Sequence, residues 1–362
     1  MVRSRGLRVD RPGGPPRLTA VDLPSPRHHE VLLEVSAAGV CGSDLHVVDA
    51  PPPPLAAALP FTLGHEVTGV VAAVGDAVET VAVGEAVAVY GPWGCGECGR
   101  CRAGSENYCL NRARLGFAGL GLGRDGGMAD AVLVAHERHL VPLRGLDPVQ
   151  AAPLTDAGLT SLHAVNLVAP RLPAAPVVAV VGVGGLGHLA VQLLRAVVPD
   201  VLVVAVDVDD AALELAARCG AQRTVRSEAG AAGLLAATGG GADAVLDMVG
   251  GPRTIRLALD VLRPGGDVAV VGSGGGALDV RKGTGLPAGV RIAFPFWGSR
   301  PELEQVLDLA RDGALRVAVE TFPLEDAAEA LRRLRAGTVR GRAVLVPGAR
   351  SASRDAGDPA WA

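Results

Sequence analysis

Apolar positions follow two different patterns along the chain, and the change falls near residue 151. Before that point, short β-type segments alternate with turns rich in glycine and proline. The clearest segments are EVLLEVSAAG (30–39), VTGVVAAVG (67–75) and EAVAVYG (85–91). Short strands bounded by Gly and Pro predict a β-rich domain with long connecting loops.

After residue 151, continuous apolar strands alternate with helical segments. The predicted strands lie at 177–184, 201–208, 242–250 and 267–274, and helical segments at 186–198 and 209–221 follow the first two. Val-rich strands without polar alternation are buried on both faces. The pattern therefore predicts a parallel sheet covered by helices, which is an α/β domain joined to a β domain.

A helix predicted at 301–313 precedes mixed α and β elements near the end of the chain. We expect a catalytic domain from 1–154, a nucleotide-binding domain from 155–299, and a return to the first domain over 300–362. The residues from about 349 onward are small and polar, which predicts a disordered tail.

Composition narrows the class of protein. The 362 residues suffice for two hydrophobic cores, and because aromatics make up only 3%, these cores must consist of Val, Leu and Ala. A net charge of −4 without a long basic run argues against nucleic acid and anionic membranes as partners. No apolar run is long enough to cross a bilayer, and the first residues do not resemble a signal peptide, so we expect a cytoplasmic protein.

Four of the six cysteines lie within one short stretch, CGECGRCRAGSENYC, at Cys95, Cys98, Cys101 and Cys109. Four thiolates at this spacing can surround one tetrahedral zinc ion, and such a closed site is structural. A disulfide cluster is the alternative, but thiolates suit the reducing cytoplasm expected here. We predict a structural zinc lobe over about 92–112.

A glycine-rich turn, GVGGLG, follows the strand at 177–184 and opens a helix. It comprises Gly182, Val183, Gly184, Gly185, Leu186 and Gly187. The three spaced glycines permit a tight turn, close approach of a pyrophosphate, and close helix–strand packing, although a purely structural turn is the alternative. Asp207 ends the next strand, where a carboxylate binds ribose hydroxyls and repels a 2′-phosphate. The motif predicts NAD(H) as the cofactor, with Asp209 or Asp210 serving as a helix N-cap.

A second group of metal-binding residue types lies outside the cysteine lobe. Cys41 occurs in CGSDLH, His65 in GHE, and Asp156 in APLTDAGLT. Three protein ligands with one open position make a catalytic zinc site. A single Cys or His is more often structural, so this prediction depends on the other motifs.

Taken together, these motifs and GRAVLVP near the end resemble the zinc-dependent medium-chain alcohol dehydrogenases, including bacterial secondary-alcohol enzymes. The resemblance covers roughly residues 20–348. It implies a GroES-like catalytic domain, a Rossmann domain, and catalytic zinc on Cys41, His65 and Asp156. Most members have Cys at the third position, so Asp156 is a departure. Glu66 is the alternative ligand or a supporting residue, and Asp44 would orient His65.

The resemblance also implies roles around the reacting atoms. Ser43 would hydrogen-bond the alcohol, and its proton would pass through the nicotinamide ribose to His46. Thr160 would pack on the nicotinamide, and Arg342 would contact the pyrophosphate. The alternatives are a turn residue for Ser43, an exposed loop residue for His46 and a surface ion pair for Arg342.

The sequence defines the substrate pocket less clearly than it defines the metal and nucleotide sites. Its candidate walls are Trp93, Leu122, Phe296 and Trp297. Since no charged residue is predicted to enter the pocket, we expect reversible hydride transfer between NAD(H) and an apolar primary or secondary alcohol. A sorbitol- or threonine-type dehydrogenase is the nearest alternative, and a non-catalytic nucleotide-binding protein is a further one.

The predicted strands at 267–272 and 290–294 close the parallel sheet at one edge. Long apolar edge strands associate unless they are covered. In the family that edge pairs with its copy, so the resemblance implies a homodimer or homotetramer.

Overall fold

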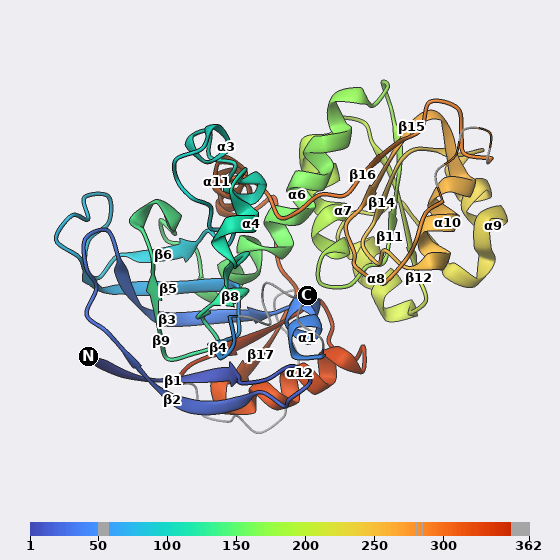
Figure 1. Ribbon diagram of the computed structural model, residues 1–362. Helices are drawn as coiled ribbons and strands as arrows, with labels where there is room; N and C mark the ends of the chain where they lie inside the picture. The colour runs from blue at the N-terminus through green and yellow to red at the C-terminus, as the bar shows by residue number, and fades with distance from the viewer. Residues whose placement is uncertain (50–57, 280, 282, 284, 349–362) are drawn as a thin grey trace.

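The computed structural model describes residues 1–49, 58–279, 281, 283 and 285–348. A β-rich body and an α/β body lie side by side in Figure 1, and both ends of the described chain belong to the β-rich body. The tail predicted from 349 onward lies outside the described residues. Within the described residues, no helix is long and apolar enough to span a membrane.

The β-rich body is built mainly from antiparallel strands. They are β1 (Val2–Val9), β2 (Arg17–Leu23), β3 (Val31–Val40), β4 (Phe61–Thr62), β5 (Glu66–Val74), β6 (Ala86–Val89), β7 (Gly119–Leu120), β8 (Gly123–Arg124), β9 (Ala131–Val134), β10 (Leu140–Pro142), β17 (Val319–Pro323) and β18 (Arg342–Val346). The main sheet has the order β10-β6-β5-β3-β18-β17, and β9 also pairs with β3. The three strands read from the sequence are therefore β3, β5 and β6.

Short helices fill the connections of this body. They are α1 (Gly42–Asp49), α3 (Gly99–Arg102), η1 (Glu106–Tyr108), α4 (Arg112–Leu115), η2 (Glu137–His139), α5 (Pro148–Ala151), η3 (Ala152–Thr155), α11 (Arg300–Arg311), η6 (Leu324–Asp326) and α12 (Ala327–Arg335). The helix predicted at 301–313 is α11. Ser299 caps it by accepting the N–H of Glu302, whose side chain reaches back to the Ser299 N–H.

The chain leaves this body after η3, builds the parallel sheet, and returns. On its return β18 pairs antiparallel with β3, with Ala343 opposite Val40. In Figure 1 this brings a red strand beside a blue one. Residues near the two ends of the described chain thus share one sheet, while the boundaries at 154 and 299 stay predictions.

The α/β body contains one sheet of order β13-β12-β11-β14-β15-β16, in which every neighbouring pair is parallel. Its strands are β11 (Val177–Val181), β12 (Leu202–Asp207), β13 (Arg223–Arg226), β14 (Ala242–Asp247), β15 (Leu262–Val270) and β16 (Arg291–Ala293). Its helices are α6 (Ala157–Val168), η4 (Ala169–Arg171), α7 (Gly187–Val197), α8 (Asp210–Arg218), η5 (Ser227–Ala229), α9 (Gly230–Thr238) and α10 (Pro252–Val261). All five residues of β11 are buried, as expected for a strand covered on both faces.

Helix α6 connects the two bodies. It follows η3 directly and lies between them in Figure 1, and it packs against α7 and α11. Asp156 directly precedes α6 and Thr160 lies in its first turn, so one helix carries site residues to the junction of the two bodies.

Candidate functional site

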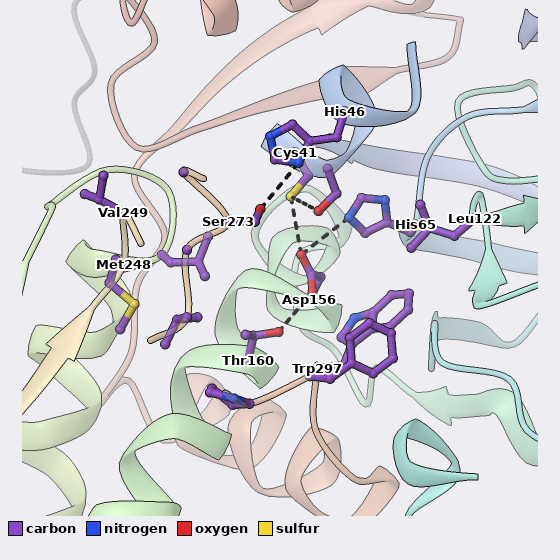
Figure 2. A pocket seen from close by; sticks show the side chains of 18 residues that line it. Cys41, His46, His65, Leu122, Asp156, Thr160, Met248, Val249, Ser273 and Trp297 are labelled. Atoms are coloured by element: carbon purple, nitrogen blue, oxygen red, sulfur yellow. Dashed lines mark hydrogen bonds and ion pairs between the residues drawn. The ribbon is translucent and has the colours of Figure 1, made fainter. Parts of the chain in front are cut away.

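A cavity of about 480 Å³ lies where the two bodies meet. Its walls come from the β3–α1 connection, the start of β5, helix α6, and the loops after β14, β15 and β16 (Figure 2). Those loops extend from the carboxyl ends of parallel strands, where ligands bind in open α/β sheets.

Three metal-binding side chains converge on this cavity. Asp156 Oδ2 lies 3.4 Å from His65 Nε2 and 3.5 Å from Cys41 Sγ, and one ligand atom from each residue lies within 4.8 Å of the others. Zinc bonds of about 2.0–2.3 Å separate neighbouring ligand atoms by about 3.3–3.7 Å in a tetrahedron. The trio therefore fits a zinc ion, and the adjoining cavity leaves room for a fourth ligand.

Charge around the trio also favours a cation. The Asp44 carboxylate accepts the Cys41 N–H at 2.8 Å and lies 3.3 Å from His65 Nδ1, and both Asp44 and His65 are buried. Burial alone would lower the pKa of His65, but the negative charges of Asp44 and Cys41 outweigh it and raise that pKa well above its usual value. The contact places Asp44 where a carboxylate orients a ligand histidine.

Glu66 pairs with Arg342. Arg342 Nε donates to Glu66 Oε2 at 2.9 Å, Arg342 Nη2 donates to Glu66 Oε1, and the N–H of Ala157 donates to Oε1 at 3.0 Å. Glu66 does not belong to the metal-binding group that the structure brings together. Its carboxylate instead holds Arg342, whose Nη2 lies 3.6 Å from Asp156 Oδ2.

Arg342 is not the surface residue of the alternative hypothesis, since only 3% of it is exposed. Besides its pair with Glu66, it touches the glycine turn: a Cβ built on Gly185 would lie 2.6 Å from Arg342 Nη1. The guanidinium thus lies between the metal-binding trio and the predicted pyrophosphate site. A pyrophosphate contact stays a prediction.

The residues of the predicted proton relay line the cavity. Ser43 Oγ lies 3.7 Å from Cys41 Sγ, and the exposed His46 has its Nδ1 3.4 Å from Ser273 Oγ. Thr160 Oγ1 donates to Asp156 Oδ1 at 3.0 Å, so it also supports the third metal-binding side chain. The relay itself stays a prediction.

The glycine turn has the geometry that its spacing predicts. Gly182 adopts φ +87°, and a Cβ on Gly187 would lie 1.9 Å from the Gly182 carbonyl oxygen, so a larger residue cannot fit there. Nothing lies within 4 Å of a Cβ position on Gly184, which leaves room for a phosphate. Val183 and Leu186 belong to the same turn, and Leu186 also lines the cavity.

Asp207 supports this turn from the next strand. Its Oδ2 accepts the N–H of Val183 at 2.6 Å, and its Oδ1 accepts the N–H groups of Val208 and Asp209 at 2.7 and 3.0 Å. Asp209 caps α8 by accepting the N–H of Ala211, which confirms the N-cap expected at Asp209 or Asp210.

Three of the four predicted pocket walls line the cavity, namely Leu122, Phe296 and Trp297. Trp93 is the exception. Its Nε1 donates to the Tyr90 carbonyl at 2.9 Å, and its ring stacks on His139 with centroids 5.0 Å apart. Trp93 is therefore a core residue beneath the cysteine lobe, and its assignment to the pocket was wrong.

Sequence reasoning missed several lining residues that follow the parallel strands. They are Met248, Val249, Val271, Gly272, Ser273, Gly274 and Pro295. Their position just after β14, β15 and β16 was the available signal, because ligands bind at the carboxyl ends of such strands.

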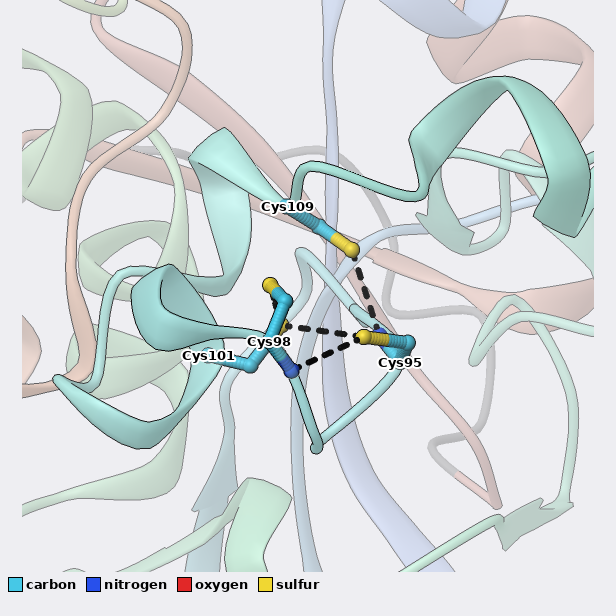
Figure 3. A group of neighbouring side chains, drawn as sticks. All are labelled: Cys95, Cys98, Cys101 and Cys109. Carbon is cyan, nitrogen blue, oxygen red and sulfur yellow. Dashed lines mark hydrogen bonds between the residues drawn. The ribbon is translucent and has the colours of Figure 1, made fainter.

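The four lobe cysteines gather at one point, as Figure 3 shows. Cys98 and Cys101 have their sulfurs 3.4 Å apart, and the sulfurs of Cys95 and Cys101 are 3.8 Å apart. All four are free thiols, which excludes the disulfide cluster in this structure. Backbone N–H groups from Cys98 and Glu97 lower the pKa of Cys95 to about 6, which favours the thiolate that zinc requires. The lobe fits a closed four-sulfur zinc site.

Comparison with known proteins gives the same picture along the whole chain. A model of the alcohol dehydrogenase GroES-like domain matches residues 27–145, and one of the zinc-binding dehydrogenases matches residues 219–345. A NAD-dependent alcohol dehydrogenase of Sulfurisphaera tokodaii is 35% identical over 358 residues, covering 95% of this chain and 100% of that relative. The chain belongs to the zinc-dependent medium-chain alcohol dehydrogenase family. This confirms the predicted oxidoreductase class and its two cofactors, zinc and NAD(H), at the level of the family.

Two further relatives show the range within this family. The D-arabinose 1-dehydrogenase (NADP(+)) of Saccharolobus solfataricus is 31% identical over 350 residues, covering 96% of this chain and 99% of the relative. The crystal structure of the alcohol dehydrogenase from Aeropyrum pernix superimposes with a TM-score of 0.87 at 33% identity, covering 95% of this chain and 100% of that one. The predicted pairing of a GroES-like domain with a Rossmann domain is thus confirmed.

Proposed function

We propose that this member of the family is an NAD(H)-dependent zinc enzyme that interconverts apolar primary or secondary alcohols with their aldehydes or ketones. The observation that carries the proposal is the shared cavity. Cys41, His65 and Asp156 line it together with Leu186 of the glycine turn, so a metal ion and a nicotinamide can act on one small molecule.

Different residues of this chain would bind the metal ion, transfer the proton and orient the substrate. Cys41, His65 and Asp156 would hold the zinc, which supplies a Lewis acid for the oxygen of the substrate. Ser43 would accept or donate the hydroxyl proton, and the exposed His46 would exchange it with solvent. The cavity walls orient the substrate against the cofactor, whose nicotinamide carries the hydride.

Asp207 supports NAD(H) as the cofactor. Its carboxylate ends β12 beside the glycine turn, and a negative charge there repels the 2′-phosphate of NADP(H). The Saccharolobus relative bears NADP(+) in its name, so cofactor choice within the family must be argued from residues of this chain. In this chain, Asp207 is the residue on which that choice is argued.

The cavity walls support an apolar substrate. Leu122, Phe296 and Trp297 line the substrate side, and the described residues that line the cavity include no Lys or Arg. A phosphate or carboxylate on the substrate would find no cationic side chain among the described lining residues. A polyol would likewise have few hydrogen-bond partners besides Ser43, His46, Thr160 and Ser273.

A substrate panel on zinc-loaded protein tests this proposal. Simple secondary alcohols, aromatic alcohols, sorbitol and threonine are each offered with NAD⁺ or NADP⁺, and reduced cofactor is followed by absorbance. We expect turnover of the apolar alcohols with NAD⁺. Preference for sorbitol or threonine would support the polyol or amino-alcohol alternative. Lack of turnover, with zinc only at the cysteine lobe, would support a non-catalytic nucleotide-binding protein.

The six cysteines support the cytoplasm as the compartment, because all are free thiols.

A further inference from the structure

A third group of metal-binding side chains lies outside both zinc sites. His29 belongs to the loop between β2 and β3, and His136 and Glu137 belong to the connection between β9 and β10. One ligand atom from each residue lies within 4.8 Å of the others. None of the three lines the active-site cavity or belongs to either of the other two metal-binding groups.

The contacts within this group hold the three side chains close together. His29 Nδ1 lies 3.2 Å from Glu137 Oε1. The rings of His29 and His136 are stacked in parallel, with centroids 4.4 Å apart and an interplanar angle of 2°. Because an imidazole binds a metal ion in the plane of its ring, the half-exposed His29 ring would turn out of this stack when both rings bind one ion. Two imidazoles beside one carboxylate form a donor set that zinc, nickel and copper ions prefer.

Glu137 is held in place before any ion binds. Its Oε2 accepts the N–H groups of Glu79 and Thr80 at 2.8 and 2.6 Å and the Thr80 hydroxyl at 2.7 Å. Burial alone would raise the pKa of Glu137, but the hydrogen bonds from Thr80, Glu79 and His29 lower it to about 2. Its Oε1 is therefore an ionised oxygen directed at His29.

His136 is also held in place. The N–H of Arg138 donates to its Nδ1 at 3.2 Å, which orients the ring. Burial, followed by the charges of Arg138 and His29, lowers the pKa of His136. A neutral imidazole is the form that binds a metal ion. His29, by contrast, has a half-exposed side chain, which gives an ion access from solvent.

We propose that His29, His136 and Glu137 form an accessory site for a divalent transition-metal ion of the zinc and nickel class. The ion would join two segments that lie 108 positions apart in the sequence. The backbone already brings them together, because the Glu137 N–H donates to the His29 carbonyl at 3.0 Å. An ion that binds only the folded chain stabilises it in proportion to its concentration.

Titration with Ni²⁺ tests this site. The protein carries no polyhistidine tag and is prepared with two zinc ions per chain, enough for the two predicted zinc sites only, and calorimetry is combined with elemental analysis. We expect one Ni²⁺ per chain to bind while the zinc content stays constant. His29→Ala and His136→Ala should each weaken this binding at least about tenfold, which is the scale of effects around metal ligands.

His28→Ala is the matched control. His28 is the neighbouring histidine, its side chain is 83% exposed, and it faces Asp76 rather than Glu137. The His28→Ala variant should bind Ni²⁺ with the same affinity as the unmodified protein. Ni²⁺ should also raise the Tm of the unmodified protein and of His28→Ala, but not that of His29→Ala.

Three results would overturn the proposal. The first is that no Ni²⁺ binds beyond the zinc already present. The second is that each Ni²⁺ taken up releases one zinc, which indicates exchange at a zinc site. The third is that His28→Ala weakens binding as much as His29→Ala does.

Discussion

At the level of the residue, the side chain of Asp156 contacts several of the groups that form the candidate zinc site. Its Oδ2 faces His65 and Cys41, its Oδ1 accepts the Thr160 hydroxyl, and Arg342 lies 3.6 Å away. Burial would raise the pKa of Asp156, but His65 and Arg342 outweigh it and lower that pKa. The carboxylate is thus ionised, as a metal ligand must be.

We expect Asp156→Ala to lower the zinc content from about two to about one ion per chain and to abolish turnover, because the trio loses an anionic ligand. Asp156→Cys should retain both ions, since a thiolate also binds zinc. Asp147→Ala is the control, because its carboxylate caps α5 and does not belong to the metal-binding trio, so the zinc content should stay unchanged. Full zinc occupancy in Asp156→Ala would show that another residue is the third ligand.

A second prediction at this scale concerns Asp207. Asp207→Ala should weaken NADH binding by about 1.5–3 kcal/mol, because charge-assisted hydrogen bonds to the ribose are lost. Calorimetric titration with NADH measures the effect. Asp210→Ala is the control, since its exposed carboxylate pairs with Arg226 and does not contact the glycine turn. Tighter binding of NADPH than NADH to the unmodified protein would contradict the role given to Asp207.

Residues whose function depends on nearby sequence were predictable, and residues placed by distant loops were not. The glycine turn and the cysteine lobe each lie within one short segment, so spacing alone defines them. Trp93 and Trp297 are both tryptophans near a predicted site, yet one packs on His139 and the other lines the cavity. Ser273 reaches His46 across the junction of the two bodies, a contact that no local pattern contains.

At the level of elements, the cysteine lobe has little regular secondary structure of its own. Its helices α3, η1 and α4 are each only three or four residues long. Helices this short do not persist by themselves in water. Glu106 helps to hold the lobe on the sheet, since it accepts the Gly94 N–H and contacts His139 and Arg138.

Cys98→Ser should therefore reduce the zinc content by about one ion per chain and lower the Tm by several degrees, because the folding energy of the lobe includes the energy of metal binding. Differential scanning calorimetry and elemental analysis measure the two effects. Cys219→Ser is the control, because Cys219 is the buried residue that ends α8 and lies outside the lobe. Loss of activity in Cys98→Ser without any loss of stability would indicate a catalytic site in the lobe instead.

The contact between α6 and α11 predicts sensitivity to acid. Glu302 lies near His163 Nδ1 at 2.9 Å and accepts hydrogen bonds from Asn166 and the Ser299 N–H. Burial would raise the pKa of Glu302, but these partners lower it to about 2. Because the folded-state pKa is depressed, this stabilisation is present above the ordinary pKa of about 4.3 and is lost as the pH falls toward 2.

Glu302→Gln should therefore lower stability near neutral pH and reduce its dependence on pH between about 4.3 and 2. Chemical denaturation at several pH values measures both. Glu304→Gln, on the same helix but 45% exposed at the side chain, is the control and should follow the unmodified protein. An unchanged pH dependence in Glu302→Gln would show that this contact is not a source of acid sensitivity.

At the level of the whole molecule, we expect one edge of the parallel sheet to pair with a second copy of the chain. Strand β16 is one of the two outer strands of the parallel sheet, and Phe294, directly after it, is 66% exposed. An apolar residue beside an uncovered strand edge favours pairing with a second copy. Light scattering should give a dimer or tetramer mass, and a mass near 36.6 kDa would contradict this.

At this scale the alternation of strands and helices was enough to predict two domains, but not the pairing of β18. That strand is short and apolar, and its sequence would suit either sheet. Its partner is decided by the return of the chain through α11 and β17, which is a property of the tertiary structure. For the same reason, the boundaries of the domains were harder to predict from the sequence than the existence of two domains.

The position of β18 also affects the order in which the protein can fold during synthesis. The edge of β3 is shared: β9 pairs with residues 31–34, and β18 pairs with residues 38–40. While the chain is being made, the second half of that edge has no partner until the last described strand leaves the ribosome. The parallel sheet is encoded without interruption and can be completed earlier. The nascent chain therefore exposes an open strand edge beside Cys41 for most of its synthesis, and a chaperone that covers it would reduce misassembly.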